Sequence, residues 1–243
     1  MDGEPTSRAP RVPMPAMWRA WGQFVRRPTL PVVKQPFAAH AVGEVASLLL
    51  LDIAFAIGLL LILSPLLSRW GITAPDFAEL TKYGPAVTLA VGALGLPIFE
   101  EIVFRSWLDG QAWRLALIAT ALATVVLLAL GNAAGLTILA RGVLLLGMIV
   151  VAIVAAIKAG TGVPDWFARN FRFFYYGSCL VFALAHMSNY DMKQPLLLLP
   201  FVLPQLAAGM IFGFARVRYG MWANVSLHAL GNALFLGASL GGM

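Results

Sequence analysis

Apolar runs of about 20 residues recur along this chain, and they constrain its fold more than any other feature. A run of that length crosses the roughly 30 Å hydrocarbon core of a bilayer as an α-helix, which satisfies its own backbone hydrogen bonds there. Hydrophobic residues make up 60% of the sequence and charged residues 12%, which is far from the composition of a soluble domain. The sequence therefore predicts a multi-pass integral membrane protein.

Polar, glycine and proline residues divide the apolar runs into candidate helices. We expect about seven, near residues 42–67, 84–108, 112–131, 135–157, 172–188, 194–216 and 221–240. The predicted fold class is all-α, a transmembrane bundle of about seven spans with a polar cavity inside it. Residues 1–40 are predicted to form a basic, proline-rich tail, and residues 41–243 the transmembrane part.

The positions of the basic residues predict an orientation. Six of the 17 lie in the first 40 residues, namely Arg8, Arg11, Arg19, Arg26, Arg27 and Lys34. If the tail is inside, the outer side keeps only Arg69, Lys82, Arg141 and Lys193. The positive-inside rule then favours a cytoplasmic N-terminus and an external or periplasmic C-terminus, with a bacterial inner membrane as the expected location.

The net charge of +6 is explained by this membrane topology and by contact with the lipid bilayer. No basic patch is interleaved with aromatic residues in a soluble domain, so nucleic acid is not an expected partner. The single cysteine, Cys179, lies within an expected span and can form neither an internal disulfide nor a thiolate cluster. Two glycine pairs, Gly131/Gly135 and Gly209/Gly213, allow close helix contact, and we interpret them as packing.

An ionisable side chain within a span costs about 2.5–3.5 kcal/mol on insertion scales, so each one needs a partner or a task. The densest cluster is Glu100, Glu101 and Arg105. Glu101 and Arg105 are four residues apart and share a helix face, which favours an ion pair. Glu100 then points about 100° away and stays available as a base. The alternative is a cluster of interfacial charges at the end of a helix.

Two later spans each carry a histidine, His186 and His228. A lone intramembrane histidine is more often a hydrogen-bonded packing residue than a catalyst. Asn224, His228 and Asn232, however, follow one another at intervals of four and form a polar stripe, which needs a cavity to face. In the first span Glu44 and Asp52 are eight apart and share a face, with Arg141 as a candidate partner; the alternative is that Arg141 snorkels to the membrane interface.

Other intramembrane protease chemistries lack their residues here. There is no His-Glu-x-x-His zinc motif, no Gly-Asp pair with a second intramembrane aspartate, and no convincing Ser–His dyad.

Three motifs occur in order, namely Glu100-Glu101-Ile-Val-Phe-Arg105, Phe182-x-x-x-His186 and His228-x-x-x-Asn232. Together they resemble the motifs of the CPBP family, which includes CAAX prenyl endopeptidases and bacterial Abi-type proteins. The resemblance implies a glutamic-type intramembrane endopeptidase that needs no cofactor.

The resemblance also implies roles. Glu100 and His186 would activate a water molecule, and His228 and Asn232 would stabilise the oxyanion. Glu101, Arg105, Phe182 and Asn224 would support the site. In an older interpretation of the motifs, Glu100, His186 and His228 bind zinc. We rank the metal-free version higher because the resemblance favours it.

The chain departs from the family pattern in one place, because 85 residues separate Glu100 from His186. The extra length corresponds to an inserted helical hairpin near residues 112–157, which could cover the site laterally or contact a partner. The leading hypothesis is hydrolysis of a membrane-associated peptide or protein. The alternative is a non-proteolytic subunit or assembly factor of a membrane complex, with partners bound through the hairpin or the tail. A transporter is a third hypothesis, although no inverted repeat supports it.

Overall fold

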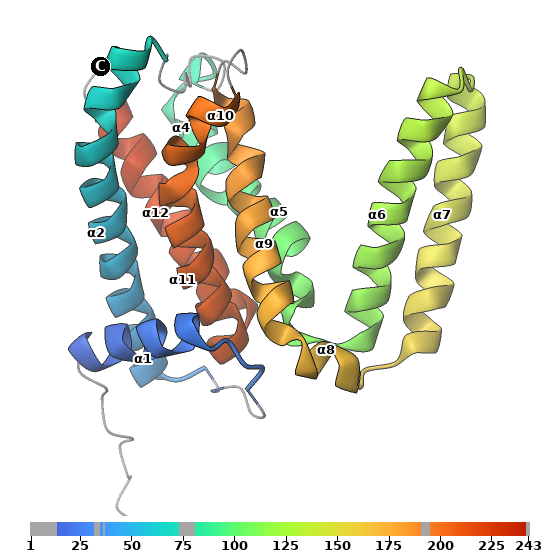
Figure 1. Ribbon diagram of the computed structural model, residues 1–243, viewed down its shortest axis with the longest axis horizontal. Coiled ribbons are helices and arrows are strands. Elements are labelled where there is room, and N and C mark those ends of the chain that lie inside the picture. Colours follow the sequence, from blue (N-terminus) through green and yellow to red (C-terminus); the bar gives the residue numbers. More distant parts are fainter. Residues whose placement is uncertain (1–13, 32–34, 36, 73–80, 191–194, 242–243) are drawn as a thin grey trace, which may run out of the picture.

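The computed structural model describes residues 14–31, 35, 37–72, 81–190 and 195–241. These residues form helices joined by turns, and no strand occurs among them, so the predicted all-α class is confirmed. The long elements stand side by side as a bundle (Figure 1). Its first member is α2 (Ala39–Trp70).

The second member is a helical rod made of four successive segments. It runs through α4 (Pro85–Thr88), the π-helix η1 (Leu89–Gly95), α5 (Leu96–Arg105) and the 3₁₀ turn η2 (Ser106–Asp109). The remaining bundle elements are α9 (Phe171–Ala185) with the 3₁₀ turn η3 (His186–Asn189), then α10 (Pro195–Leu198), η4 (Leu199–Val202), α11 (Leu203–Tyr219) and α12 (Met221–Gly241). Helices cover most of each of the seven expected apolar runs in the described part of the chain.

Five helical stretches in the described part of the chain are long and apolar enough to span a membrane. They are Ala39–Leu67, Pro85–Asp109, Ala112–Ala133, Ile138–Ala159 and Pro195–Tyr219. The other two expected spans are α9, which has only 15 residues, and α12, whose 21 residues include the polar stripe. The protein is thus an integral membrane protein by its helices, and the count of about seven spans stays a prediction.

Helix α1 (Met14–Arg26) lies across the foot of the bundle rather than along it (Figure 1). Met17 is fully buried, and the ring of Phe24 lies 5.1 Å from those of both Tyr175 and Phe214. Trp18 donates a hydrogen bond of 2.9 Å to the carbonyl of Ser47. The expectation of a basic, proline-rich tail did not include this amphipathic helix, which packs on the bundle.

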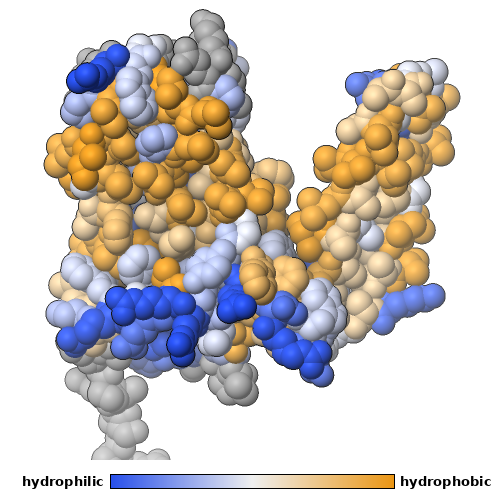
Figure 2. Space-filling model, viewed as in Figure 1, coloured by the Kyte–Doolittle hydropathy of each residue, from blue (hydrophilic) through white to orange (hydrophobic). Residues whose placement is uncertain are grey.

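Hydrophilic side chains gather at the foot, around α1 and α8 (Asp165–Arg169), below a broad apolar belt (Figure 2). The exposed cations at this end are Arg19, Arg26, Arg27, Lys158, Arg169 and Arg172. The bundle thus has an apolar belt around its middle and a polar end, as a protein that spans a bilayer requires.

Helices α6 (Ala112–Ala133) and α7 (Ile138–Ala159) form a hairpin that stands apart from the bundle (Figure 1). Helix α7 has no buried residue. Gly135 lies in the turn at φ +74°, and a Cβ at Gly131 would meet Leu136 at 2.9 Å, so this glycine pair serves the turn. Arg141 donates to Asn132 at 2.7 Å.

The proposed pairing of Arg141 with the acids of the first span is therefore wrong. Arg141 lies at the tip of the hairpin, whereas Glu44 accepts a hydrogen bond from the hydroxyl of Tyr219 on α11. The spacing of Glu44 and Asp52 predicts that both lie on one face of α2. It does not predict which helix packs against that face.

The other glycine pair lies where α9 crosses α11. A Cβ at Gly209 would lie 3.4 Å from both Arg105 Nη2 and the Phe182 ring, and one at Gly213 would lie 2.8 Å from the Tyr175 ring. The Tyr175 hydroxyl donates to the carbonyl of Met210 at 2.6 Å, which fixes that ring against α11. These two glycines let the helices meet closely, as predicted.

We expect Gly213→Ala to destabilise the protein by about 1–3 kcal/mol, because the added methyl would overlap a buried aromatic ring that cannot easily move. Gly237→Ala is the matched control, since a Cβ at Gly237 would meet nothing within 4 Å. Thermal unfolding of both variants in detergent measures the difference. Equal transition midpoints would show that α9 and α11 separate more readily than this packing indicates.

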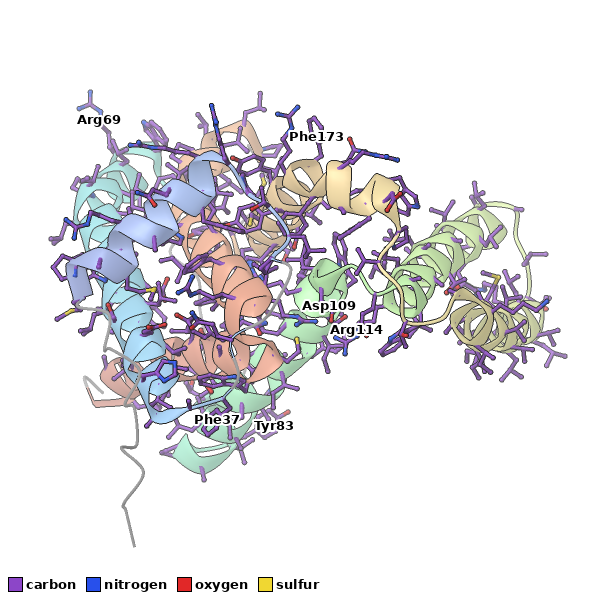
Figure 3. All side chains as sticks on the ribbon, turned by 90° about the horizontal axis from the view of Figure 1, so that it is seen from below. Phe37, Arg69, Tyr83, Asp109, Arg114 and Phe173 are labelled. Carbon is purple, nitrogen blue, oxygen red and sulfur yellow. The ribbon has the colours of Figure 1, made fainter. Side chains whose placement is uncertain are left out.

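A buried ion network joins the end of α5 to α11. Arg216 donates to the carbonyl of Arg105 at 3.0 Å, to the carbonyl of Ser106 at 2.6 Å and to Asp109 at 2.8 Å. Arg114, at the base of α6, reaches the same carboxylate at 3.3 Å. Figure 3 shows Asp109 and Arg114 directed toward one another where the hairpin leaves the bundle. This corner fixes the orientation of α5, which carries the two glutamates.

Candidate active site

The paired glutamates lie on α5, which starts directly after the π-helix η1. Pro97 stands in the first turn of α5 and has no N–H to donate to the π-helix that precedes it. Within this helix Glu101 and Arg105 are both fully buried, whereas the side chain of Glu100 is 25% exposed. Two neighbouring carboxylates therefore occupy different environments.

Glu101 is held by three side chains. It forms the predicted ion pair with Arg105 one turn along α5, and it accepts a hydrogen bond from the amide of Asn224 on α12. Its Oε1 atom also lies 2.8 Å from Nδ1 of His228. A carboxylate with all of these partners is fixed in place.

Glu100 faces the other ring nitrogen of the same histidine. Its Oε2 atom lies 3.5 Å from Nε2 of His228, and this oxygen is buried without a hydrogen-bond partner. Glu100 is thus separate from Arg105, as the helix geometry predicts, although it is not isolated, since the imidazole lies beside it. An oxygen in this state has a free lone pair for a water molecule.

His186 contacts Phe182, whose ring in turn lies next to His228. It is the first residue of η3, its Nδ1 lies 2.8 Å from the carbonyl of Phe182, and the two rings are 4.7 Å apart. The Phe182 ring is also 5.8 Å from that of His228, edge to face. Phe182 therefore lies between the two imidazoles, and no hydrogen bond or ion pair joins His186 to Glu100.

Asn232 points toward the π-helix. It donates a 3.0 Å hydrogen bond to the carbonyl of Gly92 in η1, where π-type turns often mark functional sites. An amide nitrogen has two hydrogens, so one remains for another acceptor. The stripe of α12 thus contacts two parts of the rod, because Asn224 and His228 reach α5 and Asn232 reaches η1.

Aromatic rings close the site on the side of α11. Phe212 stacks on His228 with ring centroids 5.0 Å apart, and the Arg105 guanidinium lies 3.9 Å above the Phe182 ring. Such cation–π contact partly replaces the hydrogen bonds that buried Nε and Nη2 of Arg105 lack. Sequence reasoning missed Phe212 and Gly92, since a phenylalanine or glycine in an apolar run gives no distinct signal.

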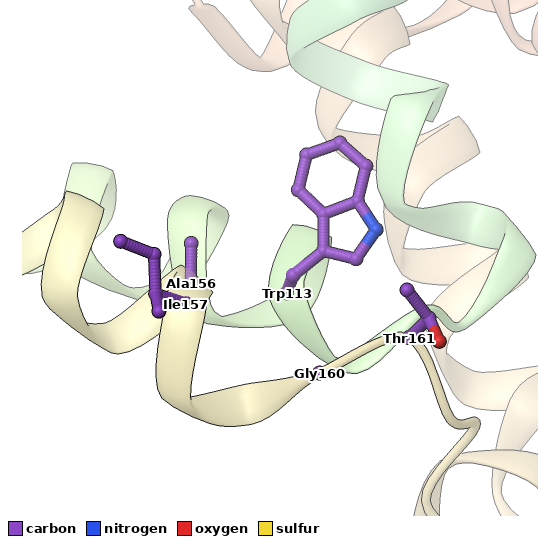
Figure 4. Close-up of a pocket in the computed structure, with 5 residues that line it drawn as sticks. All are labelled: Trp113, Ala156, Ile157, Gly160 and Thr161. Atoms are coloured by element: carbon purple, nitrogen blue, oxygen red, sulfur yellow. The ribbon is translucent and has the colours of Figure 1, made fainter.

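An open, shallow pocket lies elsewhere on the surface. It has a volume of about 380 Å³ and is found at the foot of the hairpin, lined by Trp113, Ala156, Ile157, Gly160 and Thr161 (Figure 4). Its lining contains neither an acid nor a histidine, so this cavity has no group for proton transfer. The candidate catalytic side chains are therefore those of the polar cluster between α5, α9 and α12.

The zinc alternative requires three converging ligands. Across the described residues, no group of three or more His, Cys, Asp or Glu side chains is arranged to hold a metal ion. Nδ1 of His186 contacts a backbone carbonyl and Nδ1 of His228 contacts Glu101, so Nε2 is the nitrogen of each ring that could bind zinc. The described side chains therefore do not gather as a preformed zinc site.

Comparison with known proteins gives one match. Residues 161–234 match the family model described as type II CAAX prenyl endopeptidase Rce1-like. The match begins before α8, ends within α12 and includes His186, Asn224, His228 and Asn232, while Glu100, Glu101 and Arg105 precede it. No curated protein and no solved structure matches the chain. The resemblance to the CPBP family is thereby confirmed.

Proposed function

We propose that this chain, which carries an Rce1-like domain of the CPBP family at residues 161–234, is an intramembrane endopeptidase of the glutamic type. One observation carries the proposal. Of two adjacent glutamates, Glu101 is saturated by Arg105, Asn224 and His228, while Glu100 has an oxygen without a hydrogen-bond partner beside His228. One acid thus supports the site and the other is free for chemistry.

In the proposed reaction Glu100, with His186, takes a proton from a water molecule whose oxygen attacks the substrate carbonyl carbon. The electron pair of the carbonyl moves to its oxygen, and His228 and Asn232 donate hydrogen bonds to that oxyanion. When the C–N bond breaks, Glu100 returns the proton to the leaving amine. The products are a carboxylic acid and an amine, so no cofactor is consumed.

The exposure of the side chains supports this division of roles. Glu100 is reachable because a quarter of its side chain is exposed, whereas Glu101 is fully buried and cannot meet a substrate. Glu101 fixes Nδ1 of His228, so that Nε2 is directed toward Glu100 and the reacting atoms. The substrate would be a peptide or protein associated with the membrane, since the site lies among membrane helices.

A second candidate is a non-proteolytic subunit or assembly factor of a membrane complex. The hairpin favours it, because α6 and α7 stand apart from the bundle and α7 buries nothing. Such a helix pair is suited to contact with another membrane protein. In this case the polar cluster would be retained for packing alone.

Three alanine variants separate the two candidates. If the protein is a protease, Glu100→Ala, His186→Ala and His228→Ala each stop processing of a membrane-associated substrate, and at least Glu100→Ala accumulates at the wild-type level. Immunoblots of membrane fractions measure abundance and processing together. Normal abundance and an unchanged cellular phenotype for all three variants would contradict the protease hypothesis and favour the subunit hypothesis.

We expect chelators to leave the activity unchanged. Because the proposed reaction uses no metal and the described side chains do not gather as a zinc site, treatment with EDTA or 1,10-phenanthroline should reduce the cleavage rate by less than about twofold. The measurement is the rate in proteoliposomes before and after dialysis against chelator. Loss of activity that added Zn²⁺ restores would establish the older, metal-dependent interpretation.

A further inference from the structure

The C-terminal end of α1 packs against the start of α9. The hydroxyl of Tyr176 donates a hydrogen bond to the carbonyl of Val25, and the ring of Phe24 lies 6.5 Å from that of Phe171. Just beyond α1, Leu30 packs against the same aromatic cluster as Phe24. This segment therefore lies across the first two turns of α9, at the foot of the bundle (Figure 1).

Four exposed arginine side chains surround this contact, and we call them the basic corner. Arg26 and Arg27 belong to the segment that crosses α9, Arg172 lies in the first turn of α9, and Arg169 ends α8 just before it. None of the four forms an ion pair with a described residue. The only acid within α1, α8 and α9 is Asp165. The basic corner thus carries an excess of positive charge that no described side chain neutralises.

Exposed aromatic rings accompany these cations. Phe173 is 60% exposed and Trp166 is 51% exposed, and the guanidinium of Arg172 lies 4.7 Å from the centre of the Phe173 ring. Figure 3 shows Phe173 on the outside of the bundle. Exposed Leu180 and Leu184 continue the same face of α9 away from the foot. Cations, aromatic rings and an apolar helix face follow one another in the order of the headgroup, interface and acyl chains of a phospholipid.

We propose that the basic corner binds the phosphate headgroup of an anionic phospholipid, and that this lipid fastens α1 to the start of α9. The excess charge favours an anionic lipid over a zwitterionic one, which carries its own cation beside the phosphate. The neighbouring aromatic and apolar side chains favour a lipid over a free phosphate ion. This site is separate from the polar cluster around Glu100 and does not depend on proteolytic activity.

Native mass spectrometry of the full chain in detergent tests this site, because it counts bound lipids and no charged bilayer surface is present. The probes are dioctanoyl-phosphatidylglycerol and dioctanoyl-phosphatidylcholine, which have the same acyl chains. We expect the wild type to bind phosphatidylglycerol at least roughly tenfold more tightly. Arg172→Gln should weaken this binding about fivefold and Arg26→Gln/Arg27→Gln about 30-fold, since each cation near an anionic headgroup contributes about fivefold.

Two variants are matched controls for Arg172→Gln. Arg19→Gln removes an exposed cation from the same face of α1, about 10 Å from Arg26, and Arg69→Gln removes one from the far end of α2. Each should change the affinity for phosphatidylglycerol by less than about twofold. Thermal unfolding is the second measurement, since a ligand of the folded state raises the midpoint. Phosphatidylglycerol should raise the midpoint of the wild type and of both controls, but not that of Arg26→Gln/Arg27→Gln.

Equal affinity for the two lipids overturns the proposal. Equal losses in Arg19→Gln and Arg172→Gln also overturn it, because they would show a diffuse effect of charge rather than a site. Inorganic phosphate that displaces the lipid at equal concentration would assign the basic corner to a free anion, and a hexaglutamate peptide that does so would assign it to an acidic segment of another protein. Either displacement contradicts a lipid site, whereas a lack of proteolytic activity has no bearing on it.

Discussion

The Glu100→Gln protein is expected to fold and accumulate like the wild type and to hydrolyse its substrate about 100- to 10,000-fold more slowly. Glutamine keeps the shape of the side chain, but it cannot take the proton of the attacking water. Oε2 of the partly exposed Glu100 has no hydrogen-bond partner, so the substitution removes only the charge beside Nε2 of His228, 3.5 Å away.

Rates in proteoliposomes measure this effect, with kcat and KM determined separately. We expect kcat to fall and KM to stay close to the wild-type value, since Glu100 acts on the water rather than on substrate binding. Asp165→Asn is the control, because it removes an exposed acid on α8, outside the site. A Glu100→Gln protein that cleaves at the wild-type rate would exclude Glu100 as the base.

The neighbouring glutamate should behave in the opposite way. We expect Glu101→Gln to lower the free energy of unfolding by about 3–5 kcal/mol, because it leaves the guanidinium of Arg105 buried without its counter-charge. It also weakens the anchors of Asn224 and His228. The measurement is unfolding in detergent, together with the abundance of the protein in membranes.

Arg105 provides the internal control. In Glu101→Gln/Arg105→Met no buried charge is left unpaired, so part of the lost stability should return, since replacing a whole buried ion pair is often close to neutral. Activity should not return, because His228 has lost its carboxylate partner. If Glu101→Gln unfolds at the same temperature as Glu100→Gln, the structural role of Glu101 is refuted.

Local features of the site could be predicted from the sequence. Glu101 and Arg105 pair because four residues bring side chains together on any helix, and Asn224, His228 and Asn232 share a face for the same reason. The helices themselves follow from apolar runs that need lipid as their solvent. These statements depend only on spacing within one element.

Contacts between elements could not be predicted in this way. Nothing in the spacing places Nδ1 of His228 on Glu101 and Nε2 beside Glu100, because these groups are more than 120 residues apart and meet only through helix packing. For the same reason Arg141 was assigned the wrong partner. Met17, Trp21 and Phe24 of α1 have the spacing of the apolar face of an amphipathic helix. The proline-rich sequence next to them obscured this pattern.

We propose that the polar cluster around Glu100 cleaves a membrane-associated protein. The most direct measurement compares the protein termini in membranes of cells that carry wild-type protein with those of cells that carry Glu100→Ala at equal abundance. The account predicts at least one membrane-associated protein whose new terminus is present with the wild type, absent with the variant, and restored by re-expression of the wild type. Identical termini in the two membranes would contradict it.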